Sequence, residues 1–209
     1  MKAIIFDLDG TLLDTRDDIL AAFGKAFEGL GIPAPPPQKL VSVIGKRLED
    51  CFAVFLDDDE ARSAEGARLF RSWYADHYRD RTRPYPGVEE ALARLASRHR
   101  LAVCTMKKGI YARALVDSFG WGPLFRSVLG SEEGFPAKPD PAMLLELCRR
   151  LEVEPEGVLY VGDTSLDAEM ARRAGASFAF AAYGYGSLEN QPVQVVLSSP
   201  EDLSVLGST

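Results

Sequence analysis

Short apolar runs alternate with amphipathic segments in the second part of the chain. The runs of strand length lie at residues 101–105, 128–129, 158–161, 178–181 and 195–197. Helical patterns precede or separate them at residues 88–97, 110–119, 141–151 and 166–174. Such alternation is typical of a parallel sheet with helices on both faces. The pattern therefore predicts an α/β fold with a Rossmann-like, doubly wound parallel sheet.

The chain before this region follows a different pattern. The expected segments there are a helix, a proline-rich connector and further helices, at residues 14–30, 32–37 and 38–81. Pro86 and Gly87 mark the change to the alternating pattern. We therefore expect an all-helical insert at residues 15–82, within a core formed by residues 1–14 and 83–209.

Composition limits the classes of function. The chain has 209 residues and a net charge of −7, and its basic residues are scattered among acidic ones. Nucleic-acid binding needs a concentrated positive surface, so no nucleic-acid partner is expected. Cys51, Cys104 and Cys148 are far apart, which argues against a disulfide framework or a zinc site. Without a secretory signal or a membrane-spanning run, we expect a cytoplasmic monomer or homodimer with no membrane partner.

The most informative stretch is Asp7-Leu8-Asp9-Gly10-Thr11, which follows an apolar run of strand length. Residues two apart in extended chain point the same way. Asp7 and Asp9 should therefore project together from the carboxyl end of a strand, where open α/β sheets hold their ligands. Gly10 lets the backbone approach a ligand closely, and Thr11 can cap the next turn. Like charges at 4 Å repel by roughly 4 kcal/mol at an effective dielectric of 20, so a divalent metal, a proton or a lysine is expected beside them.

Three later segments add polar groups of a consistent kind. Thr105 ends a strand and, with the backbone amide of Met106, precedes a helix, which favours anions. Lys138 stands among prolines, in a stiff segment before another helix. Asp163 and Asp167 are four residues apart and share a side if a helix begins between them. Each feature alone is also typical of an ordinary turn or helix cap.

In combination, these residues predict a phosphoryl site. Several carboxylates with a single lysine need more positive charge. Mg²⁺ suits a site in which a few carboxylates combine with water and phosphate. A hydroxyl, backbone amides at a helix start, a lysine and Mg²⁺ are groups that stabilise a transferring phosphoryl group.

The sequence resembles the haloacid dehalogenase-like hydrolase superfamily in four motifs. These match in order and spacing: Asp7-Leu8-Asp9-Gly10-Thr11, Thr105, Lys138, and Gly162-Asp163-Thr164 with Asp167. The helical insert resembles the C1-type cap domain of that superfamily. The short segments Tyr85-Pro86-Gly87 and Ala174-Gly175-Ala176 resemble the corresponding segments of its phosphoglycolate phosphatase group. The resemblance implies a Mg²⁺-dependent phosphomonoester hydrolase that acts on a small phosphorylated metabolite, with phosphoglycolate as the first candidate.

The resemblance also implies a role for each motif residue. Asp7 would be the nucleophile that becomes an aspartyl-phosphate. Asp9 would protonate the leaving oxygen and then deprotonate the attacking water. Thr105 and the amide of Met106 would hold phosphate oxygens, although many members have asparagine where Met106 stands. Lys138 would neutralise Asp7 and the developing charge.

The implied metal site and substrate site draw on further residues. Mg²⁺ would bind the carboxylates of Asp7 and Asp163 and the backbone carbonyl of Asp9, with Asp167 in support. In the cap, Lys46 and Arg47 lie in a loop that faces the active site in this family, and either could bind a substrate carboxylate. Arg47 offers two parallel hydrogen bonds. Adjacent basic residues in a loop are as often simply solvated.

Other functions remain open at this point. A sugar phosphomutase shares the motifs and the cap but returns the phosphoryl group to its substrate. A phospho-acceptor signalling domain also combines clustered acids, threonine and lysine with Mg²⁺, but it needs neither Asp9 as a general acid nor a large insert. A catalytically silent binding domain is a third alternative, and the presence of every expected catalytic residue argues against it.

Overall fold

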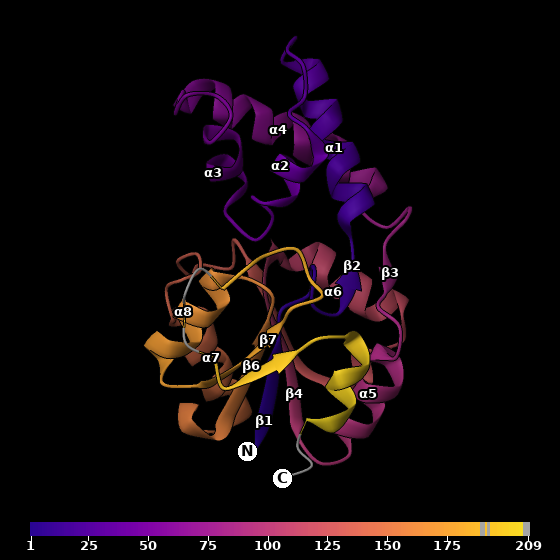
Figure 1. Cartoon of the computed structure of the whole chain (residues 1–209), viewed down its shortest axis with the longest axis vertical. Helices are drawn as coiled ribbons and strands as arrows, with labels where there is room; N and C mark the ends of the chain where they lie inside the picture. The colour runs from indigo at the N-terminus through magenta and orange to yellow at the C-terminus, as the bar shows by residue number, and fades with distance from the viewer. Residues whose placement is uncertain (189–190, 192, 207–209) are drawn as a thin grey trace. The chain divides into compact units, whose positions relative to one another are not determined.

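The computed structural model describes residues 1–188, 191 and 193–206. Contacts between residues divide the chain into two compact units. The core unit consists of Met1–Leu13 and Pro84–Thr209, and the helical unit consists of Asp14–Arg83. Both units are drawn in Figure 1.

A six-stranded parallel sheet forms the centre of the core unit. In spatial order its strands are β5 (Phe125–Ser131), β4 (Arg100–Lys108), β1 (Ala3–Phe6), β6 (Val158–Gly162), β7 (Ser177–Ala181) and β8 (Val195–Leu197). The register places Ile5 of β1 opposite Ala102 of β4 and Tyr160 of β6. The chain adds strands first on one side of β1 and then on the other, which is the doubly wound order. The predicted Rossmann-like sheet is confirmed.

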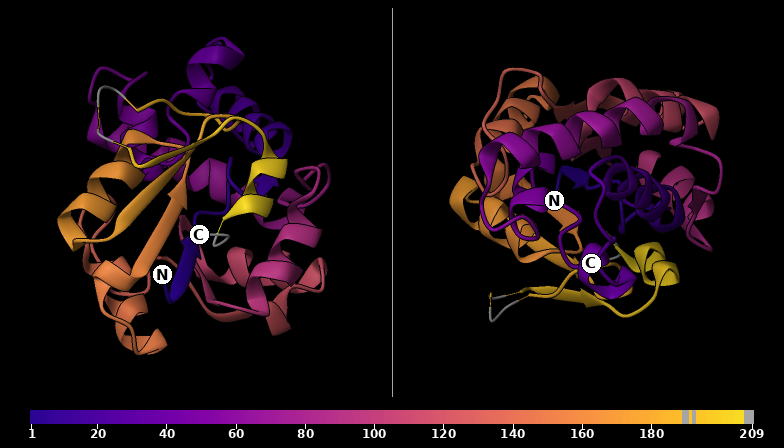
Figure 2. Two further views of the ribbon diagram at one scale, coloured as in Figure 1. Left: turned by 60° about the horizontal axis from the view of Figure 1, so that its bottom comes forward. Right: turned by 90° about the horizontal axis from the view of Figure 1, so that it is seen from above.

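Helices cover both faces of this sheet (Figure 2). Helices α7 (Ala142–Leu151) and α8 (Ser165–Ala174) pack on the face that carries Ile5 and Tyr160. Helices α5 (Val88–Ala96) and α6 (Gly109–Ser118) pack on the other face. Short 3₁₀ helices complete the unit: η1 (Gly122–Leu124), η2 (Pro155–Gly157) and η3 (Pro200–Val205). No helix in the described part of the chain is long and apolar enough to cross a membrane.

Two strands are longer than the sequence predicts. β4 continues through Lys108, past the expected end at residue 105, and there Lys108 lies opposite Ser131. β5 begins at Phe125, before the expected start at residue 128. Polar residues occur in both extensions, so hydrophobicity alone ended the predicted β4 too early and started the predicted β5 too late.

The helical unit contains α1 (Arg16–Gly29), α2 (Pro37–Val41), α3 (Leu48–Ala53) and α4 (Glu60–His77). Its core is aromatic, and the ring of Phe23 lies 5.3 Å from that of Phe52 and 4.9 Å from that of Phe70. Two short strands, β2 (Leu13–Asp14) and β3 (Arg83–Pro84), pair where the chain passes from one unit to the other. The sequence did not predict this pair, because each strand is only two residues long.

Asp18 holds the two ends of the helical unit together. Its buried carboxylate accepts hydrogen bonds from the backbone N–H of Arg81 at 3.0 Å and from the backbone N–H and hydroxyl of Thr82 at 2.9 and 2.8 Å. Asp18 lies in the first turn of α1, whereas Arg81 and Thr82 lie at the end of the unit. One carboxylate therefore joins segments far apart in the sequence.

Candidate active site

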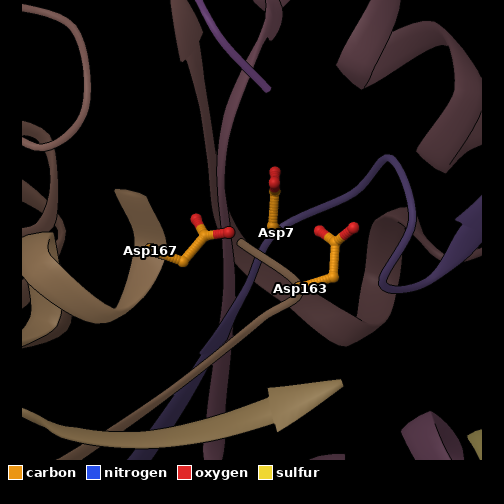
Figure 3. A group of neighbouring side chains, drawn as sticks. All are labelled: Asp7, Asp163 and Asp167. Carbon is orange, nitrogen blue, oxygen red and sulfur yellow. The ribbon is translucent and has the colours of Figure 1, made fainter. Parts of the chain in front are cut away.

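Three acids gather at the carboxyl ends of the central strands. Asp7 follows β1, Asp163 follows β6, and Asp167 lies in the first turn of α8. All three are buried, and an oxygen of each lies within 4.8 Å of the others. Figure 3 shows these carboxylates side by side. Because parallel strands end at the same edge, adjacent β1 and β6 bring distant parts of the sequence together, as expected.

Lys138 supplies an ammonium group to these acids. It lies in the segment between β5 and α7, and its side chain is only 2% exposed. The Nζ atom lies 2.7 Å from Asp167 Oδ1, 2.8 Å from the Tyr160 hydroxyl and 3.2 Å from Asp7 Oδ2. An ammonium group has three N–H donors, so these contacts use its full capacity. Lys138 is thus held beside Asp7, where the sequence predicted a fixed charge.

Tyr160 is part of this network, although no sequence pattern marked it as a site residue. Its hydroxyl accepts a hydrogen bond from Lys138 and lies 2.9 Å from the carbonyl oxygen of Cys104 and 3.1 Å from Asp167 Oδ1. Burial and the neighbouring charge of Asp167 raise the pKa of Tyr160 well above its ordinary value. The phenol therefore stays neutral. In an apolar strand, a tyrosine is indistinguishable from a core residue by pattern alone.

Asp167 is fixed by the helix that carries it. Thr164 is the N-cap of α8, and its hydroxyl and backbone N–H both donate to Asp167 Oδ2, at 2.6 and 3.0 Å. The other oxygen, Oδ1, faces Lys138 and Tyr160. Both oxygens therefore have partners within the protein. This arrangement suits a supporting acid better than a direct metal ligand.

Asp163 is held by a loop that was not predicted from the sequence pattern. Its Oδ2 accepts a hydrogen bond from the backbone N–H of Tyr185 at 2.7 Å, and the Thr11 hydroxyl lies 3.4 Å from Oδ1. Gly184 permits this approach, because a Cβ there would lie 2.3 Å from the Cβ of Asp163 and 2.5 Å from the carbonyl oxygen of Gly10. The glycines around Tyr185 were the available signal. Gly10 itself has φ of +76°, as its predicted turn requires.

The electrostatics of the group favour an added cation. Burial, together with the charges of Asp167 and Asp9 and against the opposing effect of Lys138, raises the pKa of Asp7 to about 6. Burial and the charges of Asp167 and Asp7 raise the pKa of Asp163 well above its usual range. Three buried carboxylates with one ammonium group are short of positive charge. The residues therefore fit a divalent metal ion with oxygen ligands.

Asp9 has a different environment from Asp7. Its carboxylate Oδ1 lies 3.0 Å from the Nζ atom of Lys107, whose side chain is 4% exposed. Thr105 is buried beside Asp7 and hydrogen-bonds to it. Met106 is half-buried between Thr105 and Lys107. Lys107 is a second lysine at this edge of the sheet, and it is not among the site residues predicted from the sequence.

Lys46 and Arg47 lie in the helical unit, in the loop between α2 and α3. The guanidinium of Arg47 lies 3.9 Å from a carboxylate oxygen of Glu49 and 3.8 Å from one of Asp50. Arg47 is more than half exposed, so these ion pairs are weak. Substrate binding by Lys46 or Arg47 stays a prediction.

Comparison with known proteins assigns the chain to a family. The family model described as haloacid dehalogenase-like hydrolase matches residues 4–181. A phosphoglycolate phosphatase of Aquifex aeolicus is 33% identical, covering 97% of this chain and 95% of that protein. An N-acetylmuramic acid 6-phosphate phosphatase of Pseudomonas aeruginosa is 32% identical, covering 97% and 93%.

Solved structures agree with this assignment. A haloacid dehalogenase-like hydrolase of Streptococcus pneumoniae aligns with a TM-score of 0.90 at 26% identity, covering 97% of this chain and 96% of that one. A crystal structure described as a predicted phosphoglycolate phosphatase of Haemophilus somnus aligns with a TM-score of 0.86 at 26% identity and the same coverage. The chain therefore belongs to the haloacid dehalogenase-like hydrolase family, and its relatives place it among the phosphatases of that family.

Proposed function

We propose that this chain is a Mg²⁺-dependent phosphomonoester hydrolase that works through an aspartyl-phosphate on Asp7. The observation that carries the proposal is the difference between the two motif acids. Asp7 lies among Lys138 and two further carboxylates, whereas Asp9 pairs with Lys107. Two acids in separate electrostatic environments suit two roles, a nucleophile and a proton carrier.

The proposed reaction has two steps. In the first, a carboxylate oxygen of Asp7 attacks phosphorus, and the ester P–O bond breaks as Asp9 gives a proton to the leaving oxygen. In the second, water attacks phosphorus, Asp9 takes a proton from that water, and inorganic phosphate leaves Asp7. The Thr105 hydroxyl and the Met106 amide bind phosphoryl oxygens, and Lys138 balances the negative charge at Asp7.

The donor groups of the site suit Mg²⁺. Asp7, Asp163 and the backbone carbonyl of Asp9 would hold the ion, and Asp167 would support them through Lys138. The bound ion supplies positive charge that offsets the charge of the phosphoryl group. Gly10 and Thr11 belong to the same turn and would line the phosphate position.

We propose phosphoglycolate as the substrate. The names of the two relatives above denote phosphatases of phosphorylated carboxylic acids, which supports a substrate that carries a carboxylate as well as a phosphate. Lys46 and Arg47 stay candidates for binding such a carboxylate. A cytoplasmic location and a monomeric or homodimeric state also stay predictions.

The test is phosphate release from a panel of phosphorylated metabolites in the presence of Mg²⁺, with EDTA as the blank. We expect phosphoglycolate to have the highest kcat/KM. Replacing the nucleophile, as in Asp7→Asn, should lower kcat by on the order of 10⁴ or more.

Other outcomes of this assay would change the proposal. Near wild-type turnover in Asp7→Asn would reject the mechanism. Broad, weak release without preference would keep the phosphatase and withdraw phosphoglycolate. Turnover that requires a sugar bisphosphate, without accumulation of free phosphate, would indicate the phosphomutase alternative.

A further inference from the structure

Lys107 is a buried lysine that the proposed reaction does not use. It belongs to β4, two residues after Thr105. Its side chain is 4% exposed, and its Nζ atom lies 3.0 Å from Asp9 Oδ1. Burying a lysine costs free energy unless the ammonium group is paired, so its position at the reaction centre needs a physical reason.

The fold holds Lys107 firmly in this position. The register between β4 and β5 shifts between Cys104 and Lys108, which marks an irregularity in the strand at this point. Gly130 of β5 packs so closely there that a Cβ would lie 2.6 Å from the carbonyl oxygen of Lys107. The backbone N–H of Lys107 also donates to the Thr105 hydroxyl at 3.2 Å. An irregular strand segment packed against a glycine can change the direction in which a side chain points.

The two buried lysines serve different acids. Lys138 contacts Asp7, the proposed nucleophile, and Lys107 contacts Asp9, the proposed proton donor to the leaving oxygen. A group that touches Asp9 therefore lies near the leaving group of the substrate. A group that touches Asp7 lies near the phosphoryl group instead.

We propose that Lys107 is a specificity-determining residue that binds an anionic group on the leaving group of the substrate, next to the ester oxygen. In the free enzyme its ammonium group pairs with Asp9, and in the complex it pairs with a substrate carboxylate. This inference rests on the proposed phosphatase function. It assigns carboxylate recognition to the core unit, independently of Lys46 and Arg47 in the helical unit.

The position of the carboxylate in the substrate decides which acid is recognised. In phosphoglycolate a single carbon separates the ester oxygen from the carboxylate, so the carboxylate lies within reach of a group beside Asp9. In N-acetylmuramic acid 6-phosphate the carboxylate lies on the far side of the sugar from the phosphate. Lys107 therefore favours a short 2-phospho-acid over the sugar acid.

The experiment compares two substrates that differ in the carboxylate alone. Ethyl phosphate has a methyl group where phosphoglycolate has its carboxylate. We expect Lys107→Met to lower the ratio of kcat/KM for phosphoglycolate to kcat/KM for ethyl phosphate by about 10- to 100-fold, as for the loss of a hydrogen bond to a charged group. Any effect of the substitution on Asp9 acts on both substrates and cancels in the ratio.

Two further variants complete the test. Lys108→Met, the matched control, removes the next lysine along β4, whose ammonium group pairs with Glu132, and it should leave the ratio unchanged. Lys107→Arg keeps the positive charge and should restore part of the preference. N-acetylmuramic acid 6-phosphate should respond to Lys107→Met as ethyl phosphate does.

The outcomes separate this inference from the proposed function. If Lys107→Met lowers kcat/KM equally for both substrates, Lys107 only positions Asp9 and the inference is wrong. If wild-type enzyme hydrolyses both phosphoesters equally well, the phosphatase stands and carboxylate recognition by Lys107 is again wrong. If wild-type enzyme releases no phosphate from any ester, the proposed function itself fails. Should Lys107→Met not fold, inhibition of the wild type and of Lys107→Arg by glycolate, compared with ethanol, reads out the same carboxylate preference.

Discussion

Lys138 balances the charge of the buried acids. Its Nζ atom contacts two carboxylates and a phenol while its side chain is almost fully buried. Burial alone would lower the pKa of Lys138, but the charges of Asp167 and Asp7 outweigh that effect and raise it. The residue therefore stays charged, and its removal would leave the acids without their nearest positive charge.

For Lys138→Met we expect a loss of about 3–5 kcal/mol in the free energy of unfolding, the usual cost of breaking a buried ion pair. We expect kcat to fall by roughly 10²–10³-fold as well, because the charge acts at the nucleophile. Urea unfolding and phosphate release measure the two effects. The control is Lys25→Met, which removes an exposed lysine paired with Glu28 and should stay within about 0.5 kcal/mol of wild type. Equal stability of the two variants would contradict this account.

For individual residues, the sequence predicts which acids form the site better than it predicts the groups that contact them. Asp7 and Asp163 were identified because each follows an apolar run, and Asp9 and Asp167 because they lie two and four residues further on. The positions of parallel strand ends follow from the fold. The contact from Tyr185 to Asp163 is made by a backbone N–H, which any residue could provide. No residue type marks it in advance.

The loop after β7 is the element that shapes the proposed metal site. Gly184 and Tyr185 pack against Asp163, and the Tyr183 hydroxyl donates to the carbonyl oxygen of Thr11 at 2.8 Å. The loop thus connects the turn after β1 with the end of β6. Its contacts orient Asp163, and groups that orient a ligand affect metal binding.

We expect Gly184→Ala to weaken Mg²⁺ binding by about 10- to 100-fold, because the added Cβ would displace the loop from Asp163. Titration calorimetry with Mg²⁺ measures the affinity. The matched control is Gly24→Ala in α1, where an added Cβ meets nothing within 4 Å. That change should stabilise the protein by roughly 0.5–1 kcal/mol, as expected inside a helix. Unchanged affinity in Gly184→Ala would mean that the loop does not orient Asp163.

Asp18 stabilises the helical unit, because its carboxylate joins the two ends of that unit. Asp18→Asn replaces a carboxylate oxygen by an NH₂ group that cannot accept the hydrogen bonds of Arg81 and Thr82. We expect a loss of about 1–3 kcal/mol in the free energy of unfolding, measured with urea. Asp17→Asn, at the exposed neighbouring position, should change it by no more than about 0.5 kcal/mol. Equal effects of the two substitutions would refute the role of Asp18.

For whole elements, the apolar pattern predicted which segments form strands and helices. It predicted the residues at which these elements begin and end less accurately. β4 extends through Lys107 and Lys108 because its neighbour β5 offers backbone partners there, and pairing between strands cannot be seen in one segment. The pair formed by β2 and β3 depends in the same way on residues far apart. Both were missed for this reason.

For the molecule as a whole, the buried acids make stability depend on pH. The pKa of Asp7 rises from 3.8 to about 6 on folding, and that of Asp163 also rises. Between these pH values the folded protein holds protons that the unfolded chain has released. The stability contributed by neutral Asp7 is therefore complete below about pH 4 and is lost as the pH rises through 6, and neutral Asp163 acts in the same direction.

We expect the Tm of the metal-free protein to fall as the pH is raised from 5 to 8, on account of these groups. Added Mg²⁺ should raise Tm more at pH 8 than at pH 5, since protons and the metal compete for the same carboxylates. Differential scanning fluorimetry with EDTA or Mg²⁺ at both values measures this. A variant that lacks one acid, Asp163→Asn, should have a weaker pH dependence in EDTA. A Mg²⁺ effect that is equal at both pH values would contradict the expectation.

The central place of β1 in the sheet also affects how the protein folds while it is being synthesised. β1 is made before the other strands of its sheet, and its neighbours β4 and β6 begin only at Arg100 and Val158. A nascent chain that ends before β6 leaves one edge of an apolar strand without a partner, and such edges promote aggregation. Asp7 meets Asp163 only after all the residues between them have been made. Catalytic competence is therefore acquired late, and protection by chaperones matters most before that point.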